Sequence, residues 1–287
     1  MNRRSLGPSG LTVSPIGLGA MPMSFPVPIA ESESTRLIHA SLDAGVDLID
    51  TADVYCPGEH DIGHNERVVA QALRDRPDRA RILVATKGGM QRPGGSWTTN
   101  GHPGHLKWAC ERSLKVLGVD RIALYQFHRP DPWIPFMDSV GALADLRTEG
   151  KIERIGLSNV SVDQIRAAQA LVPIASVQNC CSPFERMAWQ DGVLRYCESQ
   201  GIGFLAYSPV GGGGKSRVAN HPTLRAVGDR HGVSPFQVAL AWLLAKSPVM
   251  IPIPGASKLR NALDSAAAMQ LQLRDNDIRE LDGAFPT

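Results

Sequence analysis

The sequence has few cysteines, little net charge and no long apolar run. Its five cysteines form no CxxC pair and are too sparse for a disulfide-stapled secreted scaffold, so we interpret them as buried, inert thiols. Thirty Lys and Arg side chains nearly balance 28 Asp and Glu, which leaves a formal charge of +2. That balance argues against nucleic acid as the main partner, because nucleic-acid-binding domains usually carry a strong basic excess.

The sequence also lacks a membrane-spanning segment. The longest apolar run, residues 238–245, falls well short of the ~20 residues that a span requires. The apolar stretch at residues 11–30 follows two arginines, as in a signal peptide, but it contains four prolines. Prolines at this density break the compact apolar segment of a signal peptide. We therefore expect a cytoplasmic protein with no membrane contact.

What the chain does have is a regular alternation of two patterns over its 287 residues. Short runs rich in β-branched residues predict strands at 16–20, 46–50, 82–86, 122–127, 152–157, 174–178, 202–207 and 249–253. Apolar positions three or four residues apart predict helices at 35–43, 65–73, 105–117, 136–148, 162–171, 191–199, 222–246 and 258–268. Strictly alternating units of this kind predict a parallel sheet.

Eight strand–helix units without a linker predict a closed (β/α)8 TIM barrel, with residues 1–287 as a single domain. The alternative is a doubly wound open sheet, which normally carries a glycine-rich phosphate turn after its first strand. Residues 17–22 lack the third glycine of that turn. A second glycine-rich tract, 211–216, ends like a phosphate-binding loop but has Pro209 at the required first glycine. We interpret this tract as a flexible loop placed to close over a ligand.

Polar side chains end six of the predicted strands. They are Asp50, Lys87, His128, the pairs Ser158–Asn159 and Gln178–Asn179, and the segment Tyr207, Ser208 and Pro209. Singly, an aspartate after a strand is often a cap and a lysine is usually solvated. Because barrel enzymes place their chemistry at the carboxyl ends of the strands, six polar ends on one rim favour an active site.

The residue types on this rim suit one reaction. A free phenol has a pKa of about 10, too high for an efficient acid at neutral pH, and a nearby ammonium lowers that pKa. Asp50, Tyr55, Lys87 and His128 together supply a carboxylate to hold the lysine, a phenol to donate a proton, and an imidazole to orient a carbonyl. These groups predict carbonyl reduction, given a hydride from elsewhere. The loop histidines have no carboxylates at ligand spacing, so no metal site is predicted.

Seven motifs give the chain a family resemblance. They are DLIDTADVY (47–55), VATKGG (84–89), LYQFHRPDP (124–132), GKIERIGLSNVS (150–161), SVQN (176–179), AYSPVGGG (206–213) and IPIPGASK (251–258). In this order they resemble the aldo-keto reductases over essentially the whole chain. The opening segment, 6–19, resembles the N-terminal β-hairpin with which that family closes the barrel floor.

The resemblance implies an NADP(H)-dependent reductase of aldehydes or ketones. Tyr55 is then the general acid, Lys87 lowers the pKa of Tyr55, Asp50 pairs with Lys87, and His128 orients the substrate carbonyl. The implied nicotinamide contacts are Ser158, Asn159, Gln178 and Tyr207; those of the pyrophosphate are Ser208, Pro209 and Val210; those of the adenosine end are Gly255, Ser257, Lys258, Asp264 and Ser265.

Two departures from the family pattern stand out. Cys56 replaces a glycine common after the catalytic tyrosine, and residues 263–265 read Leu-Asp-Ser where acidic residues and asparagine are usual. Lys258 and Arg260 are both plausible partners for a 2′-phosphate, which predicts a preference for NADPH over NADH.

The substrate pocket is the least defined part of the prediction. Met23, Phe25, Trp97, Arg129 and Trp133 are candidate walls, and Trp97 either packs within its own loop or contacts the substrate. Apolar and aromatic walls suit an aromatic or alicyclic carbonyl. Similarity of GLSNVS (156–161) to a pyridoxal-reductase-like branch adds pyridoxal as a hypothesis.

Two other functions stay open at this point. Barrels of this family also serve as cofactor-binding, redox-sensing regulatory subunits, and a catalytically inactive barrel would lack one of the four catalytic residues. All four are present here. We expect a small-molecule partner and a monomer or weak homo-oligomer.

Overall fold

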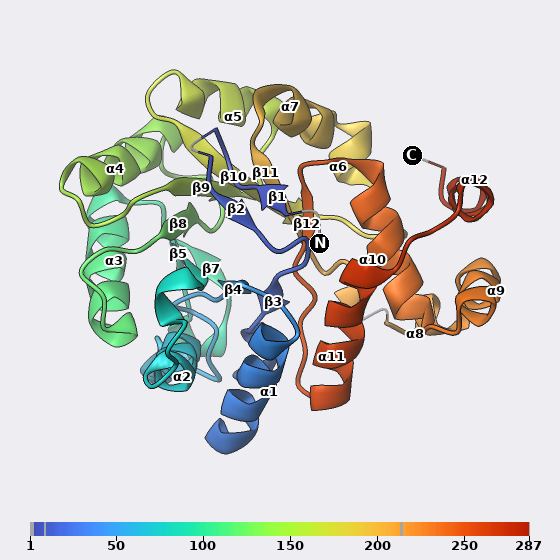
Figure 1. The fold of residues 1–287 in the computed structure, drawn as a ribbon. Coiled ribbons are helices and arrows are strands. Elements are labelled where there is room, and N and C mark those ends of the chain that lie inside the picture. The colour runs from blue at the N-terminus through green and yellow to red at the C-terminus, as the bar shows by residue number, and fades with distance from the viewer. Residues whose placement is uncertain (1–2, 9, 213–214, 287) are drawn as a thin grey trace.

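Eight parallel strands form the centre of the molecule and helices surround them (Figure 1). The computed structural model describes residues 3–8, 10–212 and 215–286, without the side chain of Lys215. The strands are neighbours in chain order: β3 (Leu18–Gly19), β4 (Leu48–Asp50), β5 (Leu83–Gly88), β8 (Leu124–Phe127), β9 (Ile155–Ser158), β10 (Ile174–Cys180), β11 (Gly203–Tyr207) and β12 (Met250–Pro252). A parallel bridge between Gly19 and Gly255 joins the two edges. The predicted (β/α)8 barrel is confirmed.

The outer layer consists of the helices between the strands and after the last one. They are α1 (Glu31–Asp43), α2 (His64–Leu73), α3 (Pro103–Leu117), α4 (Phe136–Thr148), α5 (Val162–Gln169), α6 (Met187–Gln190), α7 (Val193–Gln200), α8 (Lys215–Asn220), α9 (Pro222–His231), α10 (Pro235–Lys246), α11 (Leu259–Ala267) and α12 (Asp275–Ala284). The strand residues explain the two layers of the core. Leu124 and Leu205 belong to the inner cluster, whereas their neighbours Tyr125 and Phe204 pack outward under the helices, as the two-residue period of a strand requires.

A short antiparallel hairpin, β1 (Arg4–Ser5) and β2 (Thr12–Val13), covers the amino-terminal end of the barrel (Figure 1). Leu6, in the turn, is fully buried in the same cluster as Leu48 and Leu124. A Cβ on Gly203 would lie 2.8 Å from a Leu6 methyl carbon, so only glycine leaves room for the hairpin there. The predicted hairpin is confirmed.

The predicted helix 222–246 is wrong at its centre. The structure has two helices there, because Gly232 adopts a left-handed φ of 66° after α9 and Ser234 caps α10, with its hydroxyl accepting from the Gln237 amide. Glycine is the usual residue after the end of a helix, and Ser-Pro is a common sequence at the start of one. The apolar periodicity runs through this break and conceals it.

Other elements were not predicted from the sequence. They include α8, α12 and a second hairpin, β6 (Met90–Gln91) with β7 (Thr98–Thr99). The predicted helix 191–199 is α7, preceded by the short α6. Of the glycine-rich tract 211–216, residues 213–214 lie outside the described part, so the predicted closing loop stays a prediction.

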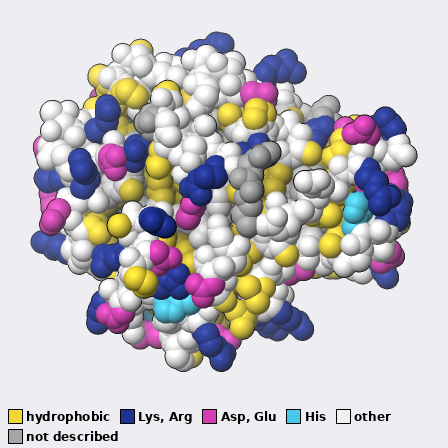
Figure 2. Space-filling view, viewed as in Figure 1, with side chains coloured by type: hydrophobic (Ala, Val, Ile, Leu, Met, Phe, Trp, Pro, Cys, Tyr) yellow, Lys and Arg dark blue, Asp and Glu magenta, His cyan; other side chains and the backbone are white. Residues whose placement is uncertain are grey.

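The surface carries both signs of charge. Figure 2 shows Lys and Arg interspersed with Asp and Glu on the face that bears the N-terminal hairpin, with hydrophobic side chains between them. Within the described residues, no helix combines the length and the apolar character that crossing a bilayer requires.

Candidate active site

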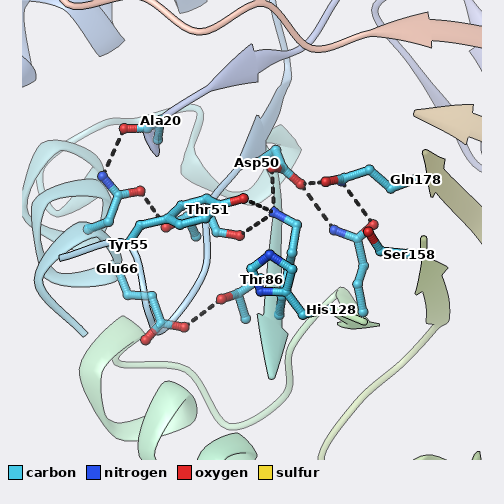
Figure 3. Close-up of polar contacts among 12 residues, drawn as sticks. Ala20, Asp50, Thr51, Tyr55, Glu66, Thr86, His128, Ser158 and Gln178 are labelled. Carbon is cyan, nitrogen blue, oxygen red and sulfur yellow. Dashed lines mark hydrogen bonds and ion pairs between the residues drawn. The ribbon is translucent and has the colours of Figure 1, made fainter. Parts of the chain in front are cut away.

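Three of the four predicted catalytic side chains are joined directly at the carboxyl ends of the strands (Figure 3). Lys87, fully buried on β5, donates to Asp50 Oδ1 at the end of β4 at 2.6 Å and to the Tyr55 phenol oxygen at 3.0 Å. Its third N–H donates a hydrogen bond to the Thr51 carbonyl at 2.9 Å. Because an ammonium has three donors and all three are used, the lysine is fixed between the carboxylate and the phenol.

Two glutamine amides hold the other oxygen of Asp50. Gln178 Nε2 lies 2.7 Å and Gln126 Nε2 3.0 Å from Asp50 Oδ2, and Gln178 Nε2 also donates to Gln126 Oε1 at 3.1 Å. The carboxylate is therefore oriented toward Lys87 from behind. Gln126 was not predicted from the sequence, although a polar residue inside the apolar strand LYQF is a usable signal.

The protonation states follow from burial and from these contacts. Burial lowers the pKa of Lys87, but the Asp50 carboxylate and the Tyr55 phenol outweigh it and the pKa is raised, so the ammonium persists. Burial raises the pKa of Tyr55. The charge of Lys87 and its hydrogen bond lower that pKa by less than burial raises it. Lys87 therefore acts on the pKa of Tyr55 in the predicted direction, but burial has the larger effect. The phenol keeps its proton at neutral pH, and because its oxygen accepts from Lys87, the O–H is left to donate.

His128 follows β8 and faces the phenol. Its ring centroid lies 5.7 Å from that of Tyr55, with the two rings nearly perpendicular. Burial, with help from the charges of Lys87 and Arg129, lowers the pKa of His128 well below its usual range. The imidazole is therefore neutral at pH 7 and can offer one N–H to an acceptor.

A cavity of about 700 Å³ opens onto these groups, a volume typical of small-molecule sites. Many of the site residues predicted from the sequence line this cavity. They are Asp50, Tyr55, Trp97, His128, Arg129, Ser158, Asn159, Gln178, Tyr207, Ser208, Pro209, Val210 and Gly255. Most of them come from different strand ends, and only the closed barrel brings them together. No group of three or more His, Cys, Asp or Glu side chains in the described part of the chain is arranged to hold a metal ion.

Comparison with known proteins decides the family. The model of the Aldo/keto reductase family matches residues 15–285. This chain is an aldo-keto reductase. It is 34% identical to "Probable aldo-keto reductase 1" from Glycine max, an alignment that covers 98% of this chain and 88% of that protein. The resemblance seen in the sequence is thus confirmed, and with it an oxidoreductase that acts on carbonyl groups.

Solved structures agree with this assignment. A glycerol dehydrogenase from Gluconobacter oxydans superposes with a TM-score of 0.86 at 26% identity, covering 98% of this chain and 94% of the other. An aldo/keto reductase from Klebsiella pneumoniae, in complex with NADP and acetate, superposes with a TM-score of 0.83 at 25% identity, covering 100% and 96%. One of these neighbours is named for glycerol and the other only for the family, so they leave the substrate of this reductase open.

The rim of the reductase cavity has unusual backbone geometry. Asn159 and Ser208 adopt left-handed φ angles of 58° and 52°, which non-glycine residues rarely do. Asn159 Oδ1 accepts from the Tyr207 phenol at 2.9 Å and its Nδ2 donates to the His128 carbonyl at 3.0 Å. Burial raises the pKa of Tyr207 to about 12, so it remains a donor to Asn159. Three strand ends are locked together in this way.

Of the residues predicted to contact the adenosine end of the cofactor, only Gly255 lines the cavity in the described part of the chain. Lys258, whose side chain is exposed, occupies the position directly before α11. Ser257 precedes Lys258, and Ser265 lies half-buried within α11. Both oxygens of Asp264 accept hydrogen bonds from α10 and its cap, at 2.7 Å from Ser234 and 2.6 Å from Gln237. The structure thus ties Asp264 to the helix layer.

The predicted substrate walls separate into two groups. Trp97 and Arg129 line the cavity. Met23 is fully buried in the core instead, and Met21, which was not predicted, takes the place at the cavity. Phe25 packs edge-on against Trp97, whereas Trp133 is 88% exposed and is not among the lining residues of the described chain.

The unpredicted hairpin supplies two of the lining residues that the sequence did not predict. Met90 and Thr99, on β6 and β7, belong to the cavity wall, as do Gly212 and Ile253. Cys56, the departure from the family pattern, is buried, and its thiol donates to the Val54 and Gly58 carbonyls at 3.3 and 3.1 Å. It packs within its own loop.

A second polar layer supports Lys87 from below (Figure 3). Thr86, next to Lys87, donates to the buried Glu66 of α2 at 2.5 Å. Thr51 donates to Asn65 at 2.6 Å, and Asn65 donates to the Ala20 carbonyl at 2.8 Å. These bonds tie α2 to β5 and to the loop after β4, which carries Tyr55.

Proposed function

We propose that this reductase converts an aldehyde or ketone to the alcohol with NADPH, with Tyr55 as the proton donor. The observation that carries the proposal is the 3.0 Å contact in which Lys87 donates to the Tyr55 phenol oxygen. That direction leaves the phenol O–H pointing its proton to another acceptor. Asp50 balances the lysine charge, so the site is poised to lose one proton from Tyr55 and no other.

The residues present fit a dinucleotide. The cavity runs from Tyr55 past the ends of β9, β10 and β11 to Gly255, in the segment between β12 and α11. A Cβ on Gly255 would lie 2.7 Å from a Pro22 ring carbon, so only glycine lets these two parts of the cavity wall pack together. The helix N-terminus of α11, with Lys258 and Arg260, suits the 2′-phosphate. The NADP-bound reductase from Klebsiella pneumoniae supports the same cofactor here.

Each predicted cofactor contact then has a place. We assign the carboxamide to Ser158, Asn159 and Gln178, the ring face to Tyr207, and the pyrophosphate to Ser208, Pro209 and Val210. The adenosine end goes to Gly255, Ser257 and Lys258, with Asp264 and Ser265 beside the adenine. Asp264 must share its carboxylate with Ser234 and Gln237 to take part. When bound, NADPH supplies a hydride.

The residues of the chain complete the reaction. As the carbonyl carbon gains the hydride and a C–H bond, negative charge develops on its oxygen. Tyr55 transfers its proton to that oxygen, which forms the alcohol O–H bond and leaves a phenolate. Lys87 stabilises this phenolate through the hydrogen bond already present. The neutral imidazole of His128 orients the carbonyl oxygen toward the phenol.

The cavity walls suit a ring-bearing substrate. Trp97, Met21 and Met90 line the cavity beside Tyr55, and such apolar and aromatic walls favour aromatic or alicyclic carbonyls. Pyridoxal is the specific candidate that the sequence resemblance supplies.

A carbonyl panel tests the proposal. NADPH absorbance is followed with pyridoxal, benzaldehyde, cyclohexanone and propanal, and each assay is repeated with NADH. We expect turnover with the ring-bearing carbonyls and higher kcat/KM with NADPH, because Lys258 and Arg260 favour the 2′-phosphate. Absence of activity on pyridoxal removes that substrate, and a preference for NADH contradicts the cofactor assignment. NADPH binding without turnover of any carbonyl supports the regulatory-subunit alternative.

A further inference from the structure

We propose that the buried Arg92 is a positioning residue that holds Trp97 as a fixed wall of the cavity and thereby sets a preference for ring-bearing carbonyls. This inference rests on the proposed function. Arg92 follows β6 directly and is only 3% exposed, which is exceptional for an arginine with no carboxylate partner among the contacts of the described chain.

Two aromatic rings cover the guanidinium. Its central carbon lies 4.2 Å from the centroid of the Trp97 ring and 4.9 Å from that of Phe25. Phe25 in turn meets Trp97 edge-on at 5.3 Å. Arginine stacks well on aromatic faces because its charge is delocalised and weakly hydrated, and the attraction grows when the pair is shielded from water. These three side chains, Phe25, Arg92 and Trp97, are called the clamp below.

Hydrogen bonds attach the clamp to the loop that carries Tyr55. Arg92 Nε donates to the Gly95 carbonyl at 3.1 Å, within the hairpin, and Nη2 donates to the Pro57 carbonyl at 3.2 Å. The Gly94 amide donates to Glu59 at 2.7 Å. The β6–β7 hairpin is thus tied to the Tyr55 loop at two points, and Arg92 makes one of them.

The third guanidinium nitrogen indicates what stabilises the buried position of Arg92. Arg92 Nη1 is buried and has no hydrogen-bond partner among the described residues. A buried charged group with an unmet donor is costly, so hydrogen bonding alone does not account for the position of this side chain. Contact with the two ring faces compensates for the loss of water.

The clamp has a direct consequence for the cavity. Trp97 lines it, and its ring centroid lies 6.4 Å from that of Tyr55. The indole therefore does both things that the sequence left open: it packs against Arg92 within its own loop and it faces the cavity. A wall fixed in advance gains more from a flat ring than from a small aliphatic group, because aromatic pairs need a defined mutual geometry.

The test compares two substrates in four variants. We expect Arg92→Met to raise KM for benzaldehyde about tenfold, equivalent to about 1.4 kcal/mol, and to leave kcat and KM for propanal within about twofold. Trp97→Ala is expected to give the same selective loss. The double variant is expected to be no worse than Trp97→Ala, because Arg92 acts through Trp97. Arg92→Lys, which keeps the charge but not the planar fork, is expected to fall between.

Controls separate this role from a general loss of structure. Arg166, an exposed residue of α5, also stacks on an aromatic ring, that of Tyr196 on α7. We expect Arg166→Met to leave KM unchanged for both substrates. Equal losses on benzaldehyde and propanal, or additive effects of Arg92→Met and Trp97→Ala, overturn the proposal.

A binding measurement keeps the inference apart from the proposed function. Calorimetric titration of benzaldehyde and propanal into protein saturated with NADP+, which cannot reduce them, gives affinities without turnover. If the wild type reduces no carbonyl, the proposed function fails, and the titration still decides the role of Arg92. We expect Arg92→Met to weaken benzaldehyde binding alone; unchanged affinity for benzaldehyde contradicts the inference.

Discussion

Lys87 organises the residues to which we assign the chemistry of this reductase. It is fully buried, and its three donors contact a carboxylate, a carbonyl and a phenol from one short stretch of chain that begins with the last residue of β4. A buried ammonium survives only when paired and fully hydrogen-bonded, because the penalty for removing it from water is several kcal/mol. Asp50 therefore has two functions, since it makes the buried charge tolerable and fixes the direction in which the lysine meets Tyr55.

Removing the phenol oxygen tests the residue-scale mechanism. In Tyr55→Phe we expect kcat for benzaldehyde reduction to fall by about 10²–10⁴-fold, the usual contribution of a positioned general acid. The dissociation constant for NADPH, measured by fluorescence titration, is expected to stay within about twofold because the phenol proton serves the substrate. Undiminished turnover in this variant contradicts the assignment of Tyr55 as the donor.

At the scale of elements, the rim loops and the last helix add what the barrel alone does not provide. The β6–β7 hairpin supplies Met90, Trp97 and Thr99 to the cavity. Helix α12, which follows the last strand and the last barrel helix, packs against α9 and α10. One buried carboxylate, that of Asp277, anchors it. Asp277 accepts from His231 at 2.7 Å, from Arg230 at 2.9 Å and from the Arg274 amide at 3.0 Å.

The Asp277 contacts predict a pH-dependent contribution to stability. Burial alone raises the pKa of Asp277, but the hydrogen bonds from His231, the Arg274 amide and Arg230 outweigh it and lower the pKa to about 2. The folded-state pKa lies below the ordinary value of about 3.9, so the stabilisation is present above pH 4 and is lost as pH falls toward 2. Because Arg230 is partly exposed, solvent screening reduces the effect to about 1–2 kcal/mol.

Urea unfolding of Asp277→Asn measures this contribution. We expect a free energy of unfolding about 1–2 kcal/mol below wild type at pH 7, with the difference shrinking as pH falls from 4 toward 2. Asp275→Asn, at an exposed position in the same first turn, controls for the helix dipole and is expected to cost less than about 0.5 kcal/mol. A difference that stays constant down to pH 2 argues against the ionised contact.

At the scale of the whole molecule, the barrel separates stability from chemistry. The N-terminal hairpin closes one end, while the catalytic residues lie at the carboxyl ends of the strands at the other. Leu6 fills the centre of the closed end and touches strands from across the barrel. A change there acts on the free energy of unfolding and leaves the distances between Lys87, Asp50 and Tyr55 as they are.

Leu6→Ala tests that separation. We expect the free energy of unfolding to fall by about 2–5 kcal/mol, from lost burial and the cavity left behind. Below the melting transition, kcat and KM are expected to stay within about twofold of wild type. Leu171→Ala, at a half-exposed leucine, is the matched control and is expected to change stability by less than about 0.5 kcal/mol. A large change in KM for Leu6→Ala contradicts the separation.

The sequence by itself determined the barrel and the family, and it predicted the four positions to which we assign the chemistry. Its strands alternate with helices, and its polar strand ends fall within a few residues of short, specific motifs, so local spacing carries the information. Only the tertiary structure decided which side chains act together. Gln126 reaches Asp50 across 76 positions, Met21 rather than Met23 lines the cavity, and Arg92 stacks on Trp97 behind the cavity wall. Such contacts depend on how strand ends and loops converge when the sheet closes, and convergence across the barrel leaves no periodic trace in the chain.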